Sequence, residues 1–525
     1  MRKKILYLLI FSAIYSSVIA QTNAVNTYAS LINEMSLKKH LAIIASDSME
    51  GRETGTAGQR KAANYIEEAF RKSGLSHPQN MNGYQQYFPI QQDVVTETSL
   101  MIDGKKMIFG SDFISPVSMN NSNSFEGKEI VFAGYGIDDE LYSDYTNIDV
   151  KGKVVVFFNG EPKKDDLFVI TGKSKSSNWS RRGITKKLET AYLKGAIGAL
   201  YINTNQETFS PQTILNSYRN IAFNTNHIEK EKKINVATIS HALVQKILGT
   251  EFSSVIADAK SSLSLNNFSI NKSIDISFGI TKASTSDSAS NVIAVIEGSD
   301  KKDEYVFLTA HYDHLGNQAG IIYNGADDDG SGTVTVLQMA SAFAQAKKEG
   351  YGPKRTMVFM TVSGEEKGLW GSEYYSDHPV FPLENTSVDL NTDMIGRIDT
   401  ERKKNDLNNY LYVVGKNKIS SELPTIVKNV NQKYSHLVLD EAFDNPNDPN
   451  RIFYRSDHYN FARKGVPILF FYDGMLQGDY HKPTDDIENI NWSIFEKRAK
   501  FIFHMAWEMA NRDEMLIRDL PLDNN

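Results

Sequence analysis

The sequence predicts an α/β protein: a three-layer domain with a mixed, mainly parallel central sheet, interrupted by a β-rich insert. Two observations carry this prediction. From Asn291 onward, apolar runs of buried-strand length alternate with helical stretches, which is typical of a parallel sheet covered by helices on both faces. Between about Val95 and Ile276, short strand-like runs are instead separated by glycine and polar turns, which indicates a second, smaller core.

Length and composition are compatible with both parts. The chain has 525 residues, of which 41% are hydrophobic and 23% charged, and this is enough for two or three domains with a large core. It contains no cysteine, so disulfides, thiolate metal ligands and cysteine nucleophiles are excluded. The formal net charge of −7 makes the chain a poor candidate for nucleic-acid binding.

Residues 1–20 read as a signal peptide. Arg2, Lys3 and Lys4 precede a short apolar run, and Val18-Ile19-Ala20 stands before a plausible cleavage point. Removing this segment takes three of the 57 basic residues and none of the 64 acidic ones, which gives a net charge of −10. No later apolar run reaches about 18 residues. We therefore expect an exported protein, periplasmic or secreted, without a membrane anchor.

The first part of the main domain is expected at residues 21–94. Its clearest element is a helix that begins at Thr56 as N-cap, with Gln59 as the capping-box partner, and ends at Gly74. One apolar stripe follows the helical period: Ala62, Ala63, Ile66, Ala69 and Phe70. The insert then spans residues 95–276, with strand-like runs such as "EIVFAGYGI" and "KGKVVVFFNG".

The remainder of the main domain is expected at residues 277–525. Its buried strands read "NVIAVIEG", "YVFLTAHYDHLG", "TMVFMTVSGEE", "VDLNTDMIG" and "PILFFYDG". Four of them lead into ionisable residues: His311 and Asp313, then Glu365 and Glu366, then Asp393, and after a short loop Tyr480 and His481. Because sites in open α/β sheets form beyond the carboxyl ends of the strands, we expect these side chains to meet there.

This set of side chains indicates a metal centre. Imidazoles and carboxylates without cysteine suit zinc, and also manganese or cobalt. Two ions about 3.5–4 Å apart need a carboxylate between them, because bare dications repel one another. The run Asp327–Asp329 in "NGADDDGSG" supplies one. A histidine ligand also needs its other ring nitrogen held, and the His-x-Asp spacing of His311 and Asp313 fits that need.

At these residues the sequence resembles the M28 family of metallopeptidases, which comprises zinc aminopeptidases and larger relatives with a protease-associated (PA) domain. The motifs that carry the resemblance are "GRETGTAGQRKAANYI", "AHYDHLG", "YNGADDDGSG", "GEEKGLWGS", "NTDMIG", "RSDHYNFARKGVPILFF" and "DYHKPTDD". The β-rich insert resembles the PA domain in its position and in its pattern of short strand-like runs. The resemblance implies a phosphorylase/hydrolase-like zinc-exopeptidase fold.

The resemblance also implies the site roles. Five residues match the ligands of two zinc ions: His311 and Asp393 for one, Glu366 and His481 for the other, and Asp328 as the bridge. Three further residues match supporting roles: Glu365 as general base, Asp313 as the residue that orients His311, and Tyr480 as a group that helps hold the oxyanion.

The residues around this set have less specific expectations. Asp329 precedes a helical stretch and is expected to be its N-cap, whereas Asp327 has no assigned role. His314 is interpreted as a hydrogen-bonding loop residue rather than a ligand. Arg455-Ser456-Asp457 is expected to shape the wall of the site. Met475 and Leu476 are either pocket residues or apolar anchors of their loop.

The function implied is a di-zinc exopeptidase acting on peptides, most simply an aminopeptidase. A bridging hydroxide would attack the peptide carbonyl, with Glu365 accepting its proton. Dipeptidase or carboxypeptidase activity remains an alternative, because such relatives change only the pocket. A glutaminyl cyclase, with one zinc and a smaller chain, and a non-catalytic binding protein fit less well, because all five ligand positions are filled. The sequence does not define side-chain preference, native metal or oligomeric state.

Overall fold

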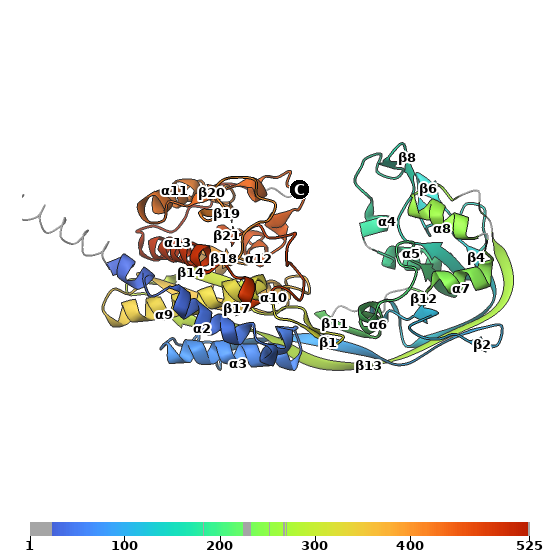
Figure 1. Ribbon diagram of the computed structural model, residues 1–525, viewed down its shortest axis with the longest axis horizontal. Coiled ribbons are helices and arrows are strands. Elements are labelled where there is room, and N and C mark those ends of the chain that lie inside the picture. The colour runs from blue at the N-terminus through green and yellow to red at the C-terminus, as the bar shows by residue number, and fades with distance from the viewer. Residues whose placement is uncertain are drawn as a thin grey trace, which may run out of the picture. The chain divides into compact units, whose positions relative to one another are not determined.

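The computed structural model describes residues 24–522 except 182, 224–232, 251, 266–267 and 269, so the predicted signal peptide at 1–20 lies outside the described residues. The chain divides into two compact units (Figure 1). The larger contains the chain up to Phe88 and from Ser288 onward, and the smaller spans Pro89–Asp287. Within the described residues, none of the helices combines the length and apolar character needed to cross a membrane.

The larger unit is built on a mixed, mainly parallel sheet, as predicted. Its strands, in spatial order, are β20 (Val438–Asp440), β19 (Tyr410–Val414), β21 (Ile468–Tyr472), β18 (Thr386–Thr392), β14 (Lys301–His311), β17 (Arg355–Val362) and the end of β13 (Asn271–Ile296). The central strands β21, β18, β14 and β17 are mutually parallel. Their carboxyl ends therefore lie at one edge of the sheet.

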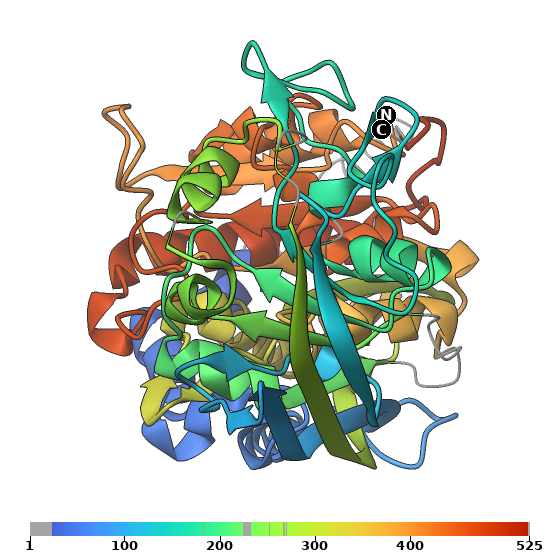
Figure 2. The same cartoon turned by 90° about the vertical axis from the view of Figure 1, so that its right-hand side faces the viewer.

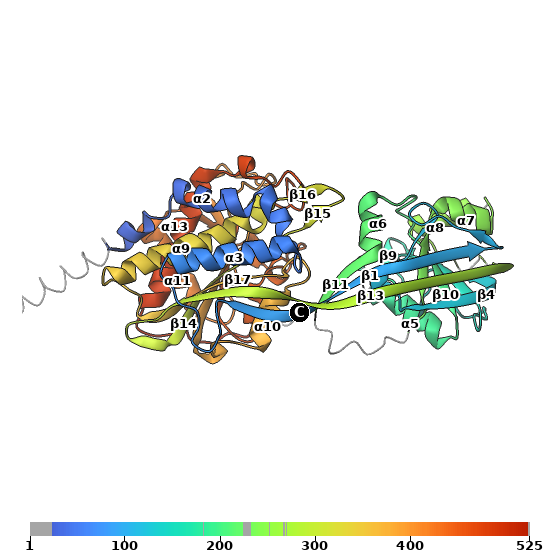
Figure 3. The same ribbon diagram turned by 90° about the horizontal axis from the view of Figure 1, so that it is seen from below.

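Helices cover both faces of this sheet (Figure 3). One face carries α2 (Glu34–Ile44), α3 (Ala57–Lys72), α9 (Gly332–Lys348), α11 (Leu423–Tyr434) and α13 (Trp492–Asn511); the other carries α10 (Trp370–Asp377) and α12 (His458–Ala462). Alternate residues of β14 pack into the cores on opposite faces of the sheet. Val306 and Leu308 join the core under α9 and α13, whereas Phe307 joins the core with Phe461 of α12. The three-layer prediction is confirmed.

Helix α3 matches the helix predicted from its apolar stripe. The Thr56 hydroxyl caps it by accepting a hydrogen bond from Gln59 N at 3.4 Å. The predicted reciprocal contact from the Gln59 side chain is wrong. That amide instead donates to the buried hydroxyl of Tyr312 at 2.5 Å, and the same hydroxyl donates to the main-chain oxygen of Ser290 at 2.6 Å.

The smaller unit has its own sheet and core, and its elements can be followed by their teal-to-green colours in Figure 2. Its parallel strands are β4 (Asn123–Phe132), β7 (Val154–Phe158), β10 (Gly198–Ile202) and β12 (Val236–Ile239), with α5 (Thr185–Leu193), α7 (His241–Leu248) and α8 (Phe252–Lys260) as helices. Its boundaries, Pro89 and Asp287, fall inside the long strands β1 (Gln85–Ile102) and β13. The resemblance of this unit to a PA domain stays a prediction.

Candidate metal centre

The candidate site lies at the carboxyl edge of the larger unit's sheet. β14 ends at His311, β17 ends three residues before Glu365, and β18 ends one residue before Asp393. Because these strands are adjacent and parallel, their last residues reach the same edge. His481 arrives from the loop that follows β21. The structure thus brings together the residues that the motifs singled out.

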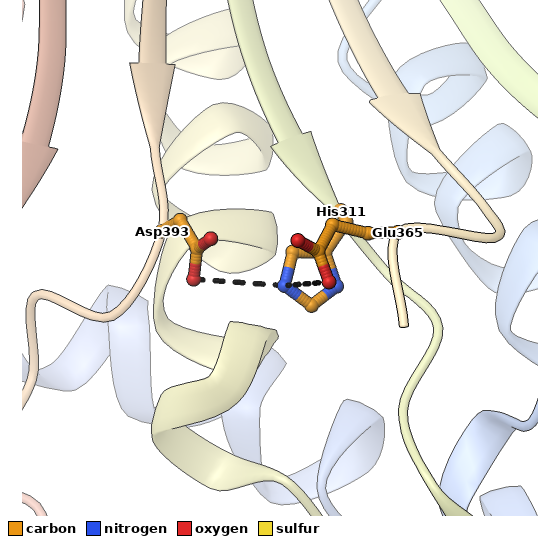
Figure 4. Close-up of side chains that lie close together, drawn as sticks. All are labelled: His311, Glu365 and Asp393. Atoms are coloured by element: carbon orange, nitrogen blue, oxygen red, sulfur yellow. Dashed lines mark ion pairs between the residues drawn. The ribbon is translucent and has the colours of Figure 1, made fainter. Parts of the chain in front are cut away.

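His311 stands at the centre of one group (Figure 4). Its Nε2 atom lies 3.5 Å from Oδ1 of Asp393 and 3.9 Å from Oε2 of Glu365. Burial disfavours a charged imidazole, but the carboxylates of Asp393 and Glu365 hold the pKa of His311 well above its usual value. The carboxylates of this group therefore surround the buried Nε2 atom of His311 with negative charge.

Glu366 stands at the centre of a second group. Its Oε2 atom lies 2.9 Å from Nε2 of His481, and its Oε1 atom lies 2.8 Å from Nδ1 of His314. Although burial and Asp328 oppose ionisation, the two histidines hold the pKa of Glu366 below its usual value. His481 also lies 3.2 Å from Oδ2 of Asp328, whereas His314 is 3.9 Å away. His481 is thus the better placed of the two histidines to share an ion with Asp328.

Asp328 connects the two groups. Its Oδ1 atom lies 3.2 Å from Nε2 of His311, and its Oδ2 atom lies 3.2 Å from Nε2 of His481. Burial disfavours its negative charge, yet the close approach of the His311 and His481 imidazoles holds its pKa well below the usual value. One carboxylate oxygen therefore faces each group, which is the arrangement that a bridging ligand requires.

Two buried residues outside the predicted set hold the aspartate run in place. The carboxylate of Asp485 accepts hydrogen bonds from Asp327 N at 2.9 Å and Asp328 N at 3.0 Å; the peptide bond between Asp328 and Asp329 is cis. Arg52, 0% exposed, donates to the carbonyls of Tyr312 at 2.7 Å and Gly325 at 2.9 Å. Burial lowers the pKa of Arg52 to about 10, so it stays charged at neutral pH.

Asp329 does not occupy the predicted N-cap position, because α9 begins at Gly332 with Ser331 before it. Its carboxylate nevertheless meets the helix start: Oδ1 accepts from Gly332 N at 2.8 Å and from Met394 N at 3.1 Å. Oδ2 accepts from His311 N at 3.2 Å. Asp329 therefore joins α9 to the ends of β14 and β18 instead of facing the metal groups.

Asp327 also has a structural partner that the sequence did not reveal. Its Oδ1 atom accepts a hydrogen bond from Gly396 N at 2.7 Å. Burial, reinforced by the nearby carboxylates of Asp473 and Asp485, raises the pKa of Asp327 well above its usual value. The surroundings of this side chain therefore favour its neutral form.

Asp327→Asn is accordingly expected to be mild. An amide has the shape of a protonated carboxyl group and keeps the acceptor for Gly396 N. We expect the free energy of unfolding to change by less than about 1 kcal/mol, with metal content unchanged. Denaturant unfolding and elemental analysis measure both. Asp327→Ala is the contrasting variant, because it leaves the buried N–H of Gly396 without its acceptor. It should lower the free energy of unfolding by about 1–3 kcal/mol. Loss of metal in Asp327→Asn would contradict this role.

Asp313 contacts the site in a different way from that predicted. Nδ1 of His311 lies 3.1 Å from the main-chain oxygen of Asp313 and 3.7 Å from its carboxylate. That carboxylate accepts from the Thr54 hydroxyl at 2.7 Å and from Glu365 N at 3.2 Å. Asp313 therefore holds His311 through its main-chain carbonyl and Glu365 through its side chain.

A pocket opens beside the two groups. Asp328, Glu365 and Asp393 line one side, and the remaining wall consists of Met394, Ile452, Arg455, Phe470, Tyr472, Leu476 and Tyr480. The hydroxyl of Tyr480 accepts from Arg455 at 3.0 Å, and its ring stacks on His481 with centroids 3.8 Å apart. Leu476 is thus a pocket residue, whereas Met475 belongs to the buried core.

The side chains fit a pair of divalent cations. His311, Glu365 and Asp393 offer donor atoms within 4.8 Å of one another, and so do His314, Asp328 and Glu366. Nε2 of His311 and Oδ2 of Asp328 are buried and lack a well-aligned hydrogen-bond partner among the described residues. Buried carboxylates in this number require paired cations or metal, and imidazole with carboxylate suits zinc.

Part of the chain matches a known family. Residues 291–506 match the family model for peptidase family M28. A probable leucine aminopeptidase of Arthroderma benhamiae is 27% identical over 226 residues, which are 42% of this chain and 57% of the relative. An aminopeptidase of Bacillus subtilis is 25% identical over 240 residues, 44% of this chain and 47% of the relative. The matches thus span about half the length of these curated relatives.

Solved structures share the fold. An aminopeptidase from Aneurinibacillus sp. strain AM-1 superposes with a TM-score of 0.57 at 17% identity, covering 95% of this chain and all of that one. A zinc aminopeptidase from Bacillus subtilis gives 0.55 at 18% identity, covering 93% and 99%. The family match contains His311, Asp328, Glu365, Glu366, Asp393 and His481. Residues 291–506, which carry the candidate metal centre, are therefore similar to peptidase family M28.

Proposed function

We propose that this protein is a di-zinc exopeptidase that releases N-terminal residues from peptides. The observation that carries the proposal is the position of Asp328, whose two oxygens each face a histidine of a different donor group. The match of residues 291–506 to the model for peptidase family M28 supports a zinc peptidase. The relatives named as aminopeptidases support attack at the N-terminal residue.

In this proposal His311 and Asp393 hold one ion, Glu366 and His481 hold the other, and Asp328 lies between them. When bound, the two cations supply a water of lowered pKa and a polarised carbonyl. Glu365 lines the pocket, and burial together with Glu366 and Asp393 raises its pKa well above the usual value. A carboxylate with a raised pKa can accept the proton from water and return it to the leaving amine.

The pocket residues supply orientation. Arg455 fixes the hydroxyl of Tyr480 by a 3.0 Å hydrogen bond, so that the phenol can donate to the oxyanion that develops on the carbonyl. The carboxylates of Asp393 and Glu365 at the pocket wall attract a free α-ammonium group. The apolar residues opposite them accept an apolar side chain.

The test compares leucyl peptides that have a free amine with the same peptides after N-acetylation, with zinc counted per chain. We expect about two zinc ions and a value of kcat/KM at least about 100-fold lower for the acetylated peptides, which corresponds to about 2.7 kcal/mol. Equal rates, or one zinc per chain, would contradict an N-terminal di-zinc exopeptidase. Cyclisation of N-terminal glutamine in place of hydrolysis would favour the cyclase alternative.

Dipeptidase activity is the second candidate, and Arg455 favours it. Arg455 is the cationic residue of the pocket wall, and among the described residues no carboxylate lies within ion-pair distance of it. It is therefore placed to hold the free C-terminal carboxylate of a dipeptide. Peptides with an amidated C-terminus separate the two activities. An aminopeptidase should still hydrolyse them, whereas a dipeptidase should not.

A further inference from the structure

His314 is a buried histidine whose ring is confined by the main chain. It lies three residues beyond His311 and is 0% exposed. Gly325 packs against it: a Cβ atom at that position would lie 2.5 Å from two carbons of the imidazole. The ring therefore depends on a glycine in the aspartate loop for its space.

The ring is directed at Glu366. Nδ1 of His314 lies 2.8 Å from Oε1 of Glu366, while Nε2 of His481 lies 2.9 Å from Oε2 of the same carboxylate. The two imidazoles stand 6.0 Å apart between centroids, at 69°. Neither ring nitrogen of His314, nor Oε1 of Glu366, has a well-aligned hydrogen-bond partner among the described residues, so the two groups meet by close approach alone. Each oxygen of Glu366 thus faces one histidine.

The two histidines differ in how firmly they are held. His481 is 36% exposed at its side chain and has a left-handed φ of 56° in a loop. His314 is fully buried, and its ring packs against Gly325. A carboxylate that binds an ion through one oxygen rotates unless its other oxygen is held, and such outer partners orient metal ligands. His314 supplies that hold on the oxygen that points away from His481.

We propose that His314 is a positioning residue for the second metal site: its Nδ1 atom, 2.8 Å from Oε1 of Glu366, holds that oxygen in place and so keeps Oε2 facing Asp328 and His481. This inference rests on the proposed di-metal function. It predicts that His314 affects the affinity of one ion and not of the other, because Nδ1 of His311, at the other site, faces the main-chain oxygen of Asp313.

The test uses the full chain with His314→Ala, His314→Asn and His481→Ala, and measures Zn²⁺ and Co²⁺ affinity per site by chelator competition. In His314→Ala we expect one ion to stay tightly bound and the other to bind about 10–100-fold more weakly. His314→Asn should restore most of that affinity, because its amide N–H stands where Nδ1 stood. The absorption spectrum of bound Co²⁺ should show a distorted second site in His314→Ala.

His504→Asn is the matched control. His504, in α13, is also a buried histidine, and its ring stacks on that of Tyr434 in α11 with centroids 4.2 Å apart. Its replacement should lower the unfolding temperature and leave both metal affinities unchanged. The same result in His314→Ala would make His314 merely structural and overturn the proposal.

Two other results are decisive. If His314→Ala and His314→Asn both abolish the second site as His481→Ala does, His314 is a ligand and the positioning role is wrong. If the wild-type chain itself binds fewer than two ions, the proposed di-zinc function fails. If the wild type binds two and the His314 variants bind them with unchanged affinity, only the inference about His314 fails.

Discussion

Glu365→Gln is expected to abolish hydrolysis while leaving about two zinc ions per chain. Glutamine has the size of glutamate, but its amide cannot accept a proton from water. General acid–base groups contribute about 10²–10⁴-fold to rate, so kcat/KM should fall by about 10²–10⁴-fold, equivalent to about 2.7–5.4 kcal/mol. The measurement combines kcat/KM on a leucyl peptide with elemental analysis of zinc.

The surroundings of Glu365 explain why this substitution should affect hydrolysis and not zinc binding. The main-chain N–H of residue 365 stays bonded to Asp313 at 3.2 Å whatever the side chain is. The side chain contacts His311 only at 3.9 Å, whereas Asp328 lies 3.2 Å from the same ring nitrogen. Zinc binding therefore does not depend on the charge at residue 365 in the way that catalysis does.

Glu68→Gln is a suitable control, because Glu68 is half exposed and forms ion pairs with Arg71 and Lys72 on the surface of α3. Exposed pairs of this kind contribute about 0–1 kcal/mol, so turnover should be unchanged. If Glu365→Gln kept turnover within about tenfold of wild type, another group would have to be the base. If it lost zinc, Glu365 would be a ligand.

The sequence was most informative where burial and chemistry leave a local signature. Apolar runs such as Val306–Ala310 have to be buried, and the ionisable residues that follow them have to lie at a strand end. Hence His311, Glu365 and Asp393 could be placed at one edge before any contact was known. The alternation of strand and helix likewise followed from local periodicity.

Contacts between residues distant in sequence left no such signature. Asp485 reaches the main chain of Asp327 across 158 residues, and Gln59 reaches Tyr312 across 253. Arg52 is a charged residue that composition alone would place on the surface, yet it is fully buried against carbonyls. The roles of these residues depend on tertiary packing, so the motif around Arg52 could be recognised but not explained.

Asp328→Ala is expected to have the largest effect on metal binding. The side chain faces His311 with one oxygen and His481 with the other, each at 3.2 Å. Its loss removes one donor from each group and also removes the negative charge that reduces repulsion between two dications. We expect zinc content to fall from about two to below one per chain, and hydrolysis to be lost with it.

Stability separates this loss from misfolding. The main-chain N–H groups of residues 327 and 328 remain bonded to Asp485 in the variant, so the loop keeps its anchor. A ligand at 100 times its Kd stabilises the folded state by about 2.7 kcal/mol. Added zinc should therefore raise the unfolding temperature of wild type and Glu365→Gln but not that of Asp328→Ala. Asp327→Asn is the control and should behave as wild type in the same titration. If added zinc raised the unfolding temperature of Asp328→Ala as much as that of Asp327→Asn, Asp328 would not bridge the two ions.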